Sequence, residues 1–131
     1  MIYSDIQKLD TLKVLKMSLL HDIVESITGD LTPEQITKEE KILLENKTFR
    51  DIIKQLPKEF SDDFLKIWKE FQENLTAESK LVHDIDKLEM SLQAKIYEKK
   101  GFKNTKSFFD SAEKQIQNKE LKEMFRKIIN Q

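Results

Sequence analysis

The sequence contains no cysteine, and it has only 2 glycines and 2 prolines among its 131 residues. The absence of cysteine excludes disulfides, thiolate metal sites and thiol nucleophiles. The scarcity of Gly and Pro leaves few turn signals along the chain. We find no secretory signal, and no apolar run approaches the roughly 20 residues of a membrane-spanning helix. We therefore expect a cytoplasmic protein that does not bind membranes.

The sequence also lacks an excess of charge of either sign. The chain has 23 basic and 24 acidic residues, a net charge of −1, and its lysines alternate with glutamates and aspartates. A nucleic-acid-binding surface needs clustered basic residues, so we expect no nucleic-acid partner. At 38% hydrophobic and 36% charged residues, the composition is that of a folded domain rather than a disordered chain.

The hydrophobic period is helical nearly everywhere, which predicts an all-α fold in which the helices form a compact cluster. The length suits one domain spanning residues 1–131. We predict N-caps at Asp10 or Thr11, Thr32, Ser61, Thr105 and Asn118, and a C-cap at Gly29. The predicted helices span residues 10–28, 33–56, 61–75, 77–100, 106–117 and 119–130.

Acids and a histidine gather on the first long helix, in the stretch "LLHDIVESITGD" (19–30). Ser18, His21, Asp22 and Glu25 form one stripe at helical spacing. The opposite arc, about 180° wide at 100° per residue, is apolar. It consists of Leu12, Leu15, Leu19, Leu20, Ile23, Val24 and Ile27.

The acids of this helix lie near its C-terminal end, where the helix dipole disfavours carboxylates by roughly 0.3–1 kcal/mol each. Asp22, Glu25 and the following Asp30 therefore need a cation from elsewhere, and a bound metal would supply it. Imidazole and carboxylate ligands suit Mn, Co, Fe, Ni or Zn better than Ca. The alternative is that the stripe is simply the solvated face of the helix.

A second candidate acid lies in the segment "KLVHDIDKLEMSLQAKIYE" (80–98). Asp86 borders the predicted core face of this helix and could complete a metal site, or it could be a half-exposed surface acid. His83 is a weaker candidate ligand, and we expect it to face solvent. The predicted core face comprises Leu81, Ile85, Leu88, Leu92 and Ile96.

Aromatic residues of the segment 61–75 read as core rather than as a surface for stacking bases. Phe64, Trp68 and Phe71 fall on one helical stripe, which predicts packing. Phe108 and Phe109 similarly predict a core or dimer contact. The sequence has no glycine-rich phosphate loop and no Ser-His-Asp context for a nucleophile.

The segment "KMSLLHDIVESITGDLTP" (16–33), the later "KLVHDIDKLEMSLQAKIYE" and the tail "GFKNTKSFFDSAEKQI" (101–116) resemble, in this order, HD-domain metal-dependent phosphohydrolases. The branch they resemble includes the 5′-deoxynucleotidases. The resemblance implies that the chain acts on deoxynucleoside 5′-monophosphates or similar nucleotides, and that it forms a homodimer.

The resemblance also implies the roles of individual residues. His21 and Asp22 would be the metal-ligating pair, and Asp86 would be the last ligand of a divalent transition metal. Glu25 would be the general acid/base beside the reacting water, and Asp30 a second acid near the substrate. We therefore expect His21, Asp22 and Asp86 to converge on one pocket.

In that family a further metal histidine lies on an earlier helix, but no histidine precedes His21 here. The chain thus resembles a family member without its N-terminal helices, and part of the apolar arc of residues 10–28 should be uncovered. This departure supports an alternative function. The chain would then be an inactive, truncated HD-domain remnant that serves as a helical oligomerisation or interaction module.

Overall fold

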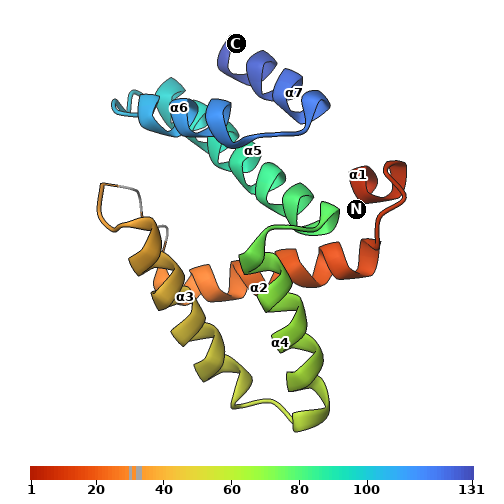
Figure 1. Ribbon diagram of the computed structural model, residues 1–131. Coiled ribbons are helices and arrows are strands. Elements are labelled where there is room, and N and C mark those ends of the chain that lie inside the picture. The colour runs from red at the N-terminus through yellow and green to blue at the C-terminus, as the bar shows by residue number, and fades with distance from the viewer. Residues whose placement is uncertain (30, 32–33) are drawn as a thin grey trace. The chain divides into compact units, whose positions relative to one another are not determined.

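The computed structural model describes residues 1–29, 31 and 34–131. The described residues form seven helices and no strand, which confirms the expected all-α fold (Figure 1). They divide into two compact units, Met1–Ser79 (unit 1) and Lys80–Gln131 (unit 2). The helices are α1 (Ile2–Ile6), α2 (Thr11–Thr28), α3 (Lys38–Ile53), α4 (Lys58–Glu73), α5 (Ala77–Lys99), α6 (Lys106–Gln115) and α7 (Lys119–Ile129).

Helix α2 begins and ends where the sequence predicts. The side chain of Asp10 accepts a hydrogen bond from the backbone N–H of Lys13 at 3.0 Å, which satisfies one of the free donors of the first turn. Gly29 follows the last residue with φ +78°, and its N–H donates to the Glu25 carbonyl. This backbone conformation is open to glycine and strained for other residues.

The starts of α3 and α4 differ from the prediction. Thr32 and Pro33 lie outside the described residues, and α3 is instead capped by Thr37, which forms a capping box with Glu40. The backbone and side-chain hydrogen bonds from Thr37 lower the pKa of Glu40 below its ordinary value. Ser61 does not cap α4: it lies one turn inside the helix, which starts after Pro57, and its hydroxyl donates to the Lys58 carbonyl.

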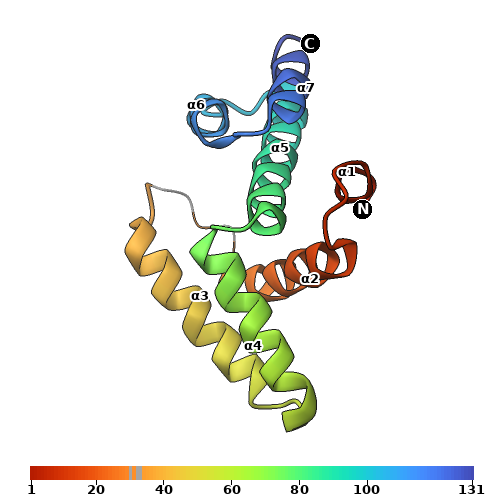
Figure 2. The ribbon, with the colours of Figure 1, turned by 45° about the vertical axis from the view of Figure 1, so that its right-hand side comes forward.

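Unit 1 is a cluster in which α2 packs against both α3 and α4, while α3 and α4 lie side by side (Figures 1 and 2). Phe49 of α3 stacks on Trp68 of α4 with ring centroids 4.6 Å apart, and the indole N–H donates to Asn46. Trp68 is 4% exposed, which confirms its packing role. The core of this unit consists of Val14, Met17, Leu20, Val24, Phe49, Ile53, Ile67, Trp68 and Phe71.

The buried face of α2 is not centred on the predicted apolar arc. Within that arc Leu20 and Val24 are buried, but five members are exposed. The reason is that α3 and α4 pack against the neighbouring face, which carries Val14, Met17 and His21. The expectation that part of the arc would be uncovered is thereby confirmed. The exposed members are Leu12, Leu15, Leu19, Ile23 and Ile27.

Unit 2 joins α5 to the helical pair α6 and α7. Asp84 of α5 is 5% exposed and accepts hydrogen bonds from the backbone N–H groups of Gln117 and Asn118, at 3.1 and 2.7 Å. Asn118 in turn caps α7 by accepting from the N–H of Leu121, as the sequence predicts. At α6, Thr105 occupies the N-cap position but makes no side-chain capping bond.

The predicted core face of α5 is buried at Leu81 and half-buried at Ile85 and Leu88, but it is exposed in the second half of the helix. Leu81 is 3% exposed, whereas Leu92 and Ile96 are 47% and 39% exposed. The buried residues in the second half are instead Ser91 and Ala94, whose small side chains allow close packing. Aliphatic periodicity therefore misplaced the face, because it gave no weight to small residues.

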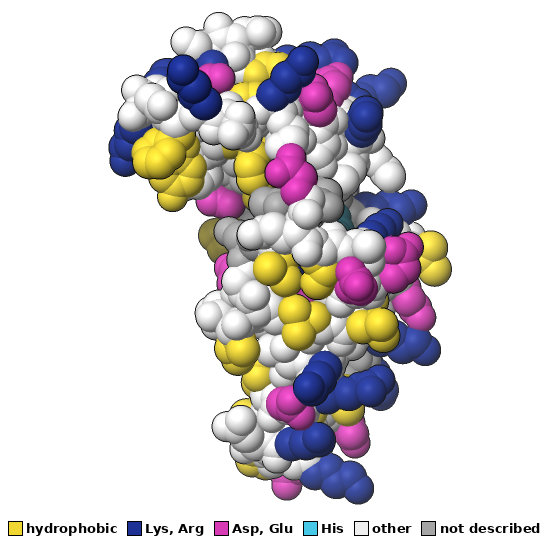
Figure 3. Space-filling model, turned by 90° about the vertical axis from the view of Figure 1, so that its left-hand side faces the viewer, with side chains coloured by type: hydrophobic (Ala, Val, Ile, Leu, Met, Phe, Trp, Pro, Cys, Tyr) yellow, Lys and Arg dark blue, Asp and Glu magenta, His cyan; other side chains and the backbone are white. Residues whose placement is uncertain are grey.

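The surface mixes charges of both signs. Figure 3 shows basic and acidic side chains side by side on the face that it draws, with hydrophobic side chains between them. No helix of the described residues is long and apolar enough to cross a lipid bilayer. Whether residues 1–131 form a single domain stays a prediction.

Candidate functional site

The predicted stripe of α2 separates into buried and exposed members. His21 is 7% exposed, and its ring lies against Phe71 of α4, with centroids 5.3 Å apart. The side chain of Glu25 is 19% exposed, whereas that of Asp22 is 79% exposed. The alternative of a purely solvated face is therefore wrong for His21, because α4 packs over it.

Two carboxylates flank the imidazole of His21. Its Nδ1 lies 3.5 Å from Oδ1 of Asp22, and its Nε2 lies 3.1 Å from Oε1 of Glu25. The Nε2 contact has the length of a hydrogen bond and joins residues one helical turn apart. The structure thus brings together three of the five site residues that the sequence predicts.

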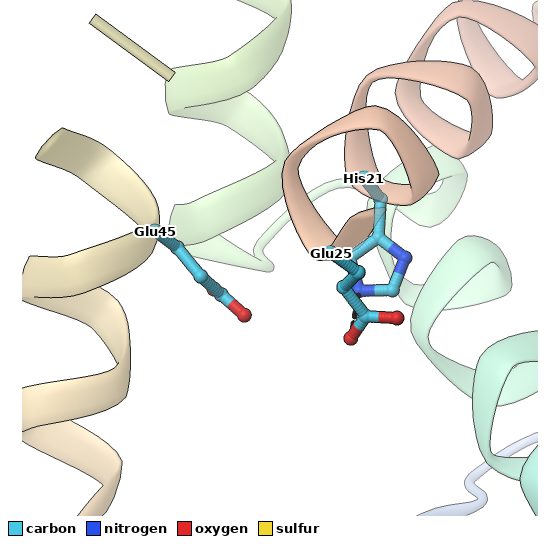
Figure 4. Close-up of side chains that lie close together, drawn as sticks. All are labelled: His21, Glu25 and Glu45. Atoms are coloured by element: carbon cyan, nitrogen blue, oxygen red, sulfur yellow. Dashed lines mark ion pairs between the residues drawn. The ribbon is translucent and has the colours of Figure 1, made fainter. Parts of the chain in front are cut away.

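A fourth member of the cluster, Glu45, was not predicted. It is only 6% exposed, and it extends from α3 toward His21 and Glu25 (Figure 4). Its Oε2 accepts a hydrogen bond from Nε2 of Gln72 on α4 at 3.2 Å. The sequence held one signal for it, because Glu45 lies one and two turns before the buried Phe49 and Ile53 on the same face of α3.

Lys41 of α3 brings a positive charge to one acid of α2. Its Nζ lies 3.7 Å from Oε1 of Glu25 and 3.6 Å from Oε1 of Glu45. The two lysines of α2 itself pair elsewhere, Lys13 with Glu70 and Lys16 with Asp63. The hydrogen bond with Glu70 raises the pKa of Lys13 above its ordinary value. The bound metal that the sequence argument calls for stays a prediction, and Lys41 supplies one positive charge beside Glu25.

The donor chemistry of the cluster also fits a metal ion. One ligand atom each from His21, Glu25 and Glu45 lie within 4.8 Å of one another, on two helices of unit 1. One imidazole nitrogen and two carboxylate oxygens are the donors that Mn, Fe, Co, Ni and Zn accept. Rigid helices hold all three residues, so a metal would need little rearrangement of the backbone.

Two further residues belong to the predicted site. Asp86 lies in unit 2, where its Oδ2 pairs with Nζ of Lys87 at 3.3 Å and its side chain is 20% exposed. Its convergence with His21 and Asp22 stays a prediction. Asp30 lies outside the described residues.

Comparison with known proteins places these residues in a family. A model of the HD domain matches residues 1–129. A protein of Dictyostelium discoideum named 5′-deoxynucleotidase HDDC2 is 41% identical over 117 residues, which cover 85% of this chain and 62% of that protein.

Two further relatives carry the same activity in their names. The Homo sapiens 5′-deoxynucleotidase HDDC2 is 34% identical, covering 76% of this chain and 50% of its own length. The Schizosaccharomyces pombe 5′-deoxynucleotidase hdd1 is 40% identical, covering 67% of this chain and 47% of its own length. The chain thus spans between about half and three fifths of the length of these relatives. From the match across residues 1–129 and the paired His21 and Asp22, we conclude that the chain belongs to the HD domain family.

Proposed function

We propose that this protein is a metal-dependent phosphohydrolase that removes phosphate from deoxynucleoside 5′-monophosphates or similar nucleotides. The observation that carries the proposal is the buried His21, flanked by Asp22 and Glu25, in a chain of the HD domain family. The names of the relatives support this substrate class. The exposed apolar residues of α2 fit a self-associating enzyme as well as an inactive interaction module, so they do not favour the module.

In the proposed site, His21, Asp22 and Asp86 would hold the metal. A bound divalent transition metal would activate water as a nucleophile and draw electron density from the phosphoryl oxygens. Glu25, whose carboxylate lies at the Nε2 edge of His21, accepts the proton of the attacking water. Asp30 lies near the substrate in this proposal.

The proposed reaction is a hydrolysis with a balanced proton transfer. The water oxygen bonds to phosphorus while its proton passes to Glu25. The bond between phosphorus and the 5′ oxygen breaks, and the departing oxygen takes up the proton from Glu25, which returns to its carboxylate form. The products are a deoxynucleoside and inorganic phosphate.

The remaining parts of the proposal concern the whole protein. We propose one HD domain, and the family match across residues 1–129 of both units supports this. We also propose a homodimer in the cytoplasm, and the exposed apolar residues of α2 support self-association. The net charge of −1 supports the absence of a nucleic-acid partner.

Phosphate release tests the proposed function directly. The full chain, loaded with Mn²⁺ or Co²⁺, should release inorganic phosphate from dAMP, dGMP, dCMP or dTMP. Glu25→Gln should lower kcat by roughly 10²–10⁴, the usual contribution of a general base. Glu73→Gln, an exposed acid at the end of α4, is the matched control and should leave kcat unchanged. Absence of phosphate release from all four nucleotides with either metal would contradict the proposal.

A further inference from the structure

Lys41 is held between two carboxylates without a short hydrogen bond to either. Its Nζ lies 3.7 Å from Glu25 and 3.6 Å from Glu45, which is within ion-pair range but beyond the usual 2.7–3.2 Å of a hydrogen bond. Its side chain is 28% exposed, so solvent or a ligand can reach it. The ammonium group can therefore turn toward a further acceptor while it keeps its two acidic neighbours.

The buried Glu45 explains why Lys41 stays in this place. Its Oε2 accepts from Gln72, and its Oε1 faces Lys41 one helical turn earlier on α3. A carboxylate that is 6% exposed needs such partners, because a buried charge without them is costly. Glu45 is thus a positioning residue that anchors Lys41 beside Glu25.

A phosphate group that reacts at Glu25 must come close to Lys41. A general base lies about 2.6–3.2 Å from the water that it activates, and that water lies about 3–3.5 Å from the atom it attacks. The oxygens of the phosphoryl group then lie within a few ångströms of the Glu25 carboxylate, where Asp22 and Glu45 also repel them. Nζ of Lys41, which lies within ion-pair distance of both Glu25 and Glu45, supplies a positive charge at this place.

We propose that Lys41 is a substrate-binding residue, which donates a hydrogen bond to a non-bridging oxygen of the substrate phosphate next to Glu25. This inference rests on the proposed function. It adds a protein cation to the site, and it assigns phosphate recognition to α3 of unit 1. The bond would offset the repulsion between the phosphate and the acids around it.

Binding of inorganic phosphate to the metal-loaded full chain, measured by isothermal titration calorimetry, tests the inference apart from catalysis. Lys41→Gln should weaken phosphate binding by roughly 10- to 100-fold, the loss expected for one hydrogen bond to a charged group. It should raise the KM for dCMP by a similar factor, while the metal content stays the same. Lys41→Arg should recover most of both losses, and Lys47→Gln, an exposed lysine of α3, should behave as the wild type.

A second variant tests the inference in case Lys41→Gln fails to fold. Lys41→Gln leaves Glu45 buried without its cation, so this variant can lose stability. The double variant Lys41→Gln with Glu45→Gln removes both charges and should fold. With equal metal content, it should bind phosphate roughly 10- to 100-fold more weakly than the single variant Glu45→Gln. Equal phosphate affinity of these two folded variants would overturn the inference.

The two proposals fail in distinguishable ways. If the wild type hydrolyses dCMP and the Lys41 variants keep its KM and its phosphate affinity, the assignment of Lys41 is wrong and the proposed function stands. If the wild type hydrolyses none of the four nucleotides yet binds phosphate through Lys41, the proposed reaction is wrong and the phosphate site stands. A wild type that neither hydrolyses nor binds phosphate overturns both.

Discussion

Substitutions of two aspartates of α5, Asp84 and Asp86, should affect different properties, the first stability and the second metal binding. Asp84 is 5% exposed and accepts from the backbone N–H groups of Gln117 and Asn118, whereas Asp86 pairs with its neighbour Lys87. We expect Asp84→Ala to destabilise the protein and to retain metal. We expect Asp86→Ala to cost less stability and to lose metal.

The expected losses of stability follow from the contacts that each aspartate makes. Each hydrogen bond to the charged Asp84 contributes about 1.5–3 kcal/mol, and two donors lose their acceptor. Water can reach these half-buried N–H groups in part, so we take the lower end, about 3 kcal/mol. For a chain of this length about 1 kcal/mol shifts Tm by 3–5 °C, so Tm should fall by roughly 10–15 °C. Loss of the Asp86–Lys87 pair should cost less, about 1.5 kcal/mol, because one contact of 3.3 Å is lost instead of two hydrogen bonds.

The assay combines thermal unfolding of the metal-free protein, followed by circular dichroism, with elemental analysis after Mn²⁺ or Co²⁺ loading. Metal must be absent from the unfolding experiment, because a bound ligand raises apparent stability. Asp110→Ala, at an exposed position of α6, is the matched control and should change neither quantity. A Tm within about 3 °C of the wild type for Asp84→Ala would refute the energetic argument. Full metal content in Asp86→Ala would refute its assignment as a ligand.

Two further predictions concern the backbone and the pH dependence. Gly29→Ala should destabilise the protein by about 1–3 kcal/mol, because φ +78° and ψ 169° strain any residue with a Cβ. An unchanged midpoint of urea unfolding would contradict this. The hydrogen bond from Arg126 lowers the pKa of Glu113 below its ordinary 4.5, so this pair stabilises the fold above that pH. Its contribution is lost as the pH falls through the lowered pKa. Arg126→Gln should therefore raise the pKa of Glu113 in an NMR titration, and an unmoved pKa would exclude this pairing in solution.

Local rules predicted those parts of the fold that depend on neighbouring residues. Asp10, Gly29 and Asn118 cap their helices as expected, since a cap needs partners within a few positions of the chain. The capping box of Thr37 and Glu40 was equally readable, but the Thr-Pro pair at 32–33 drew the prediction upstream. At α4, Pro57 precedes the first turn, and Ser61 was mistaken for its cap.

The sequence predicted which types of side chain form the site better than it predicted which residues they belong to. His21, Asp22 and Glu25 share one helix, so their spacing alone brought them within contact distance. Glu45 and Lys41 belong to another helix, and neither is distinguishable by residue type from the many other glutamates and lysines. The spacing of apolar residues on α3 could have indicated that Glu45 is buried, but not that it faces His21.

By itself, the sequence determined the helical class, the caps at Asp10, Gly29 and Asn118, the resemblance to the HD domain family and the identity of the imidazole and carboxylate donors. These properties depend on short-range spacing and on residue chemistry. The tertiary structure alone decided which face of α2 is buried, because leucines cover one face of that helix as fully as Val14, Met17 and His21 line the other. It also decided that the acids of α2 meet Glu45 and Lys41. That meeting depends on how α3 packs on α2, which no local pattern in either helix encodes.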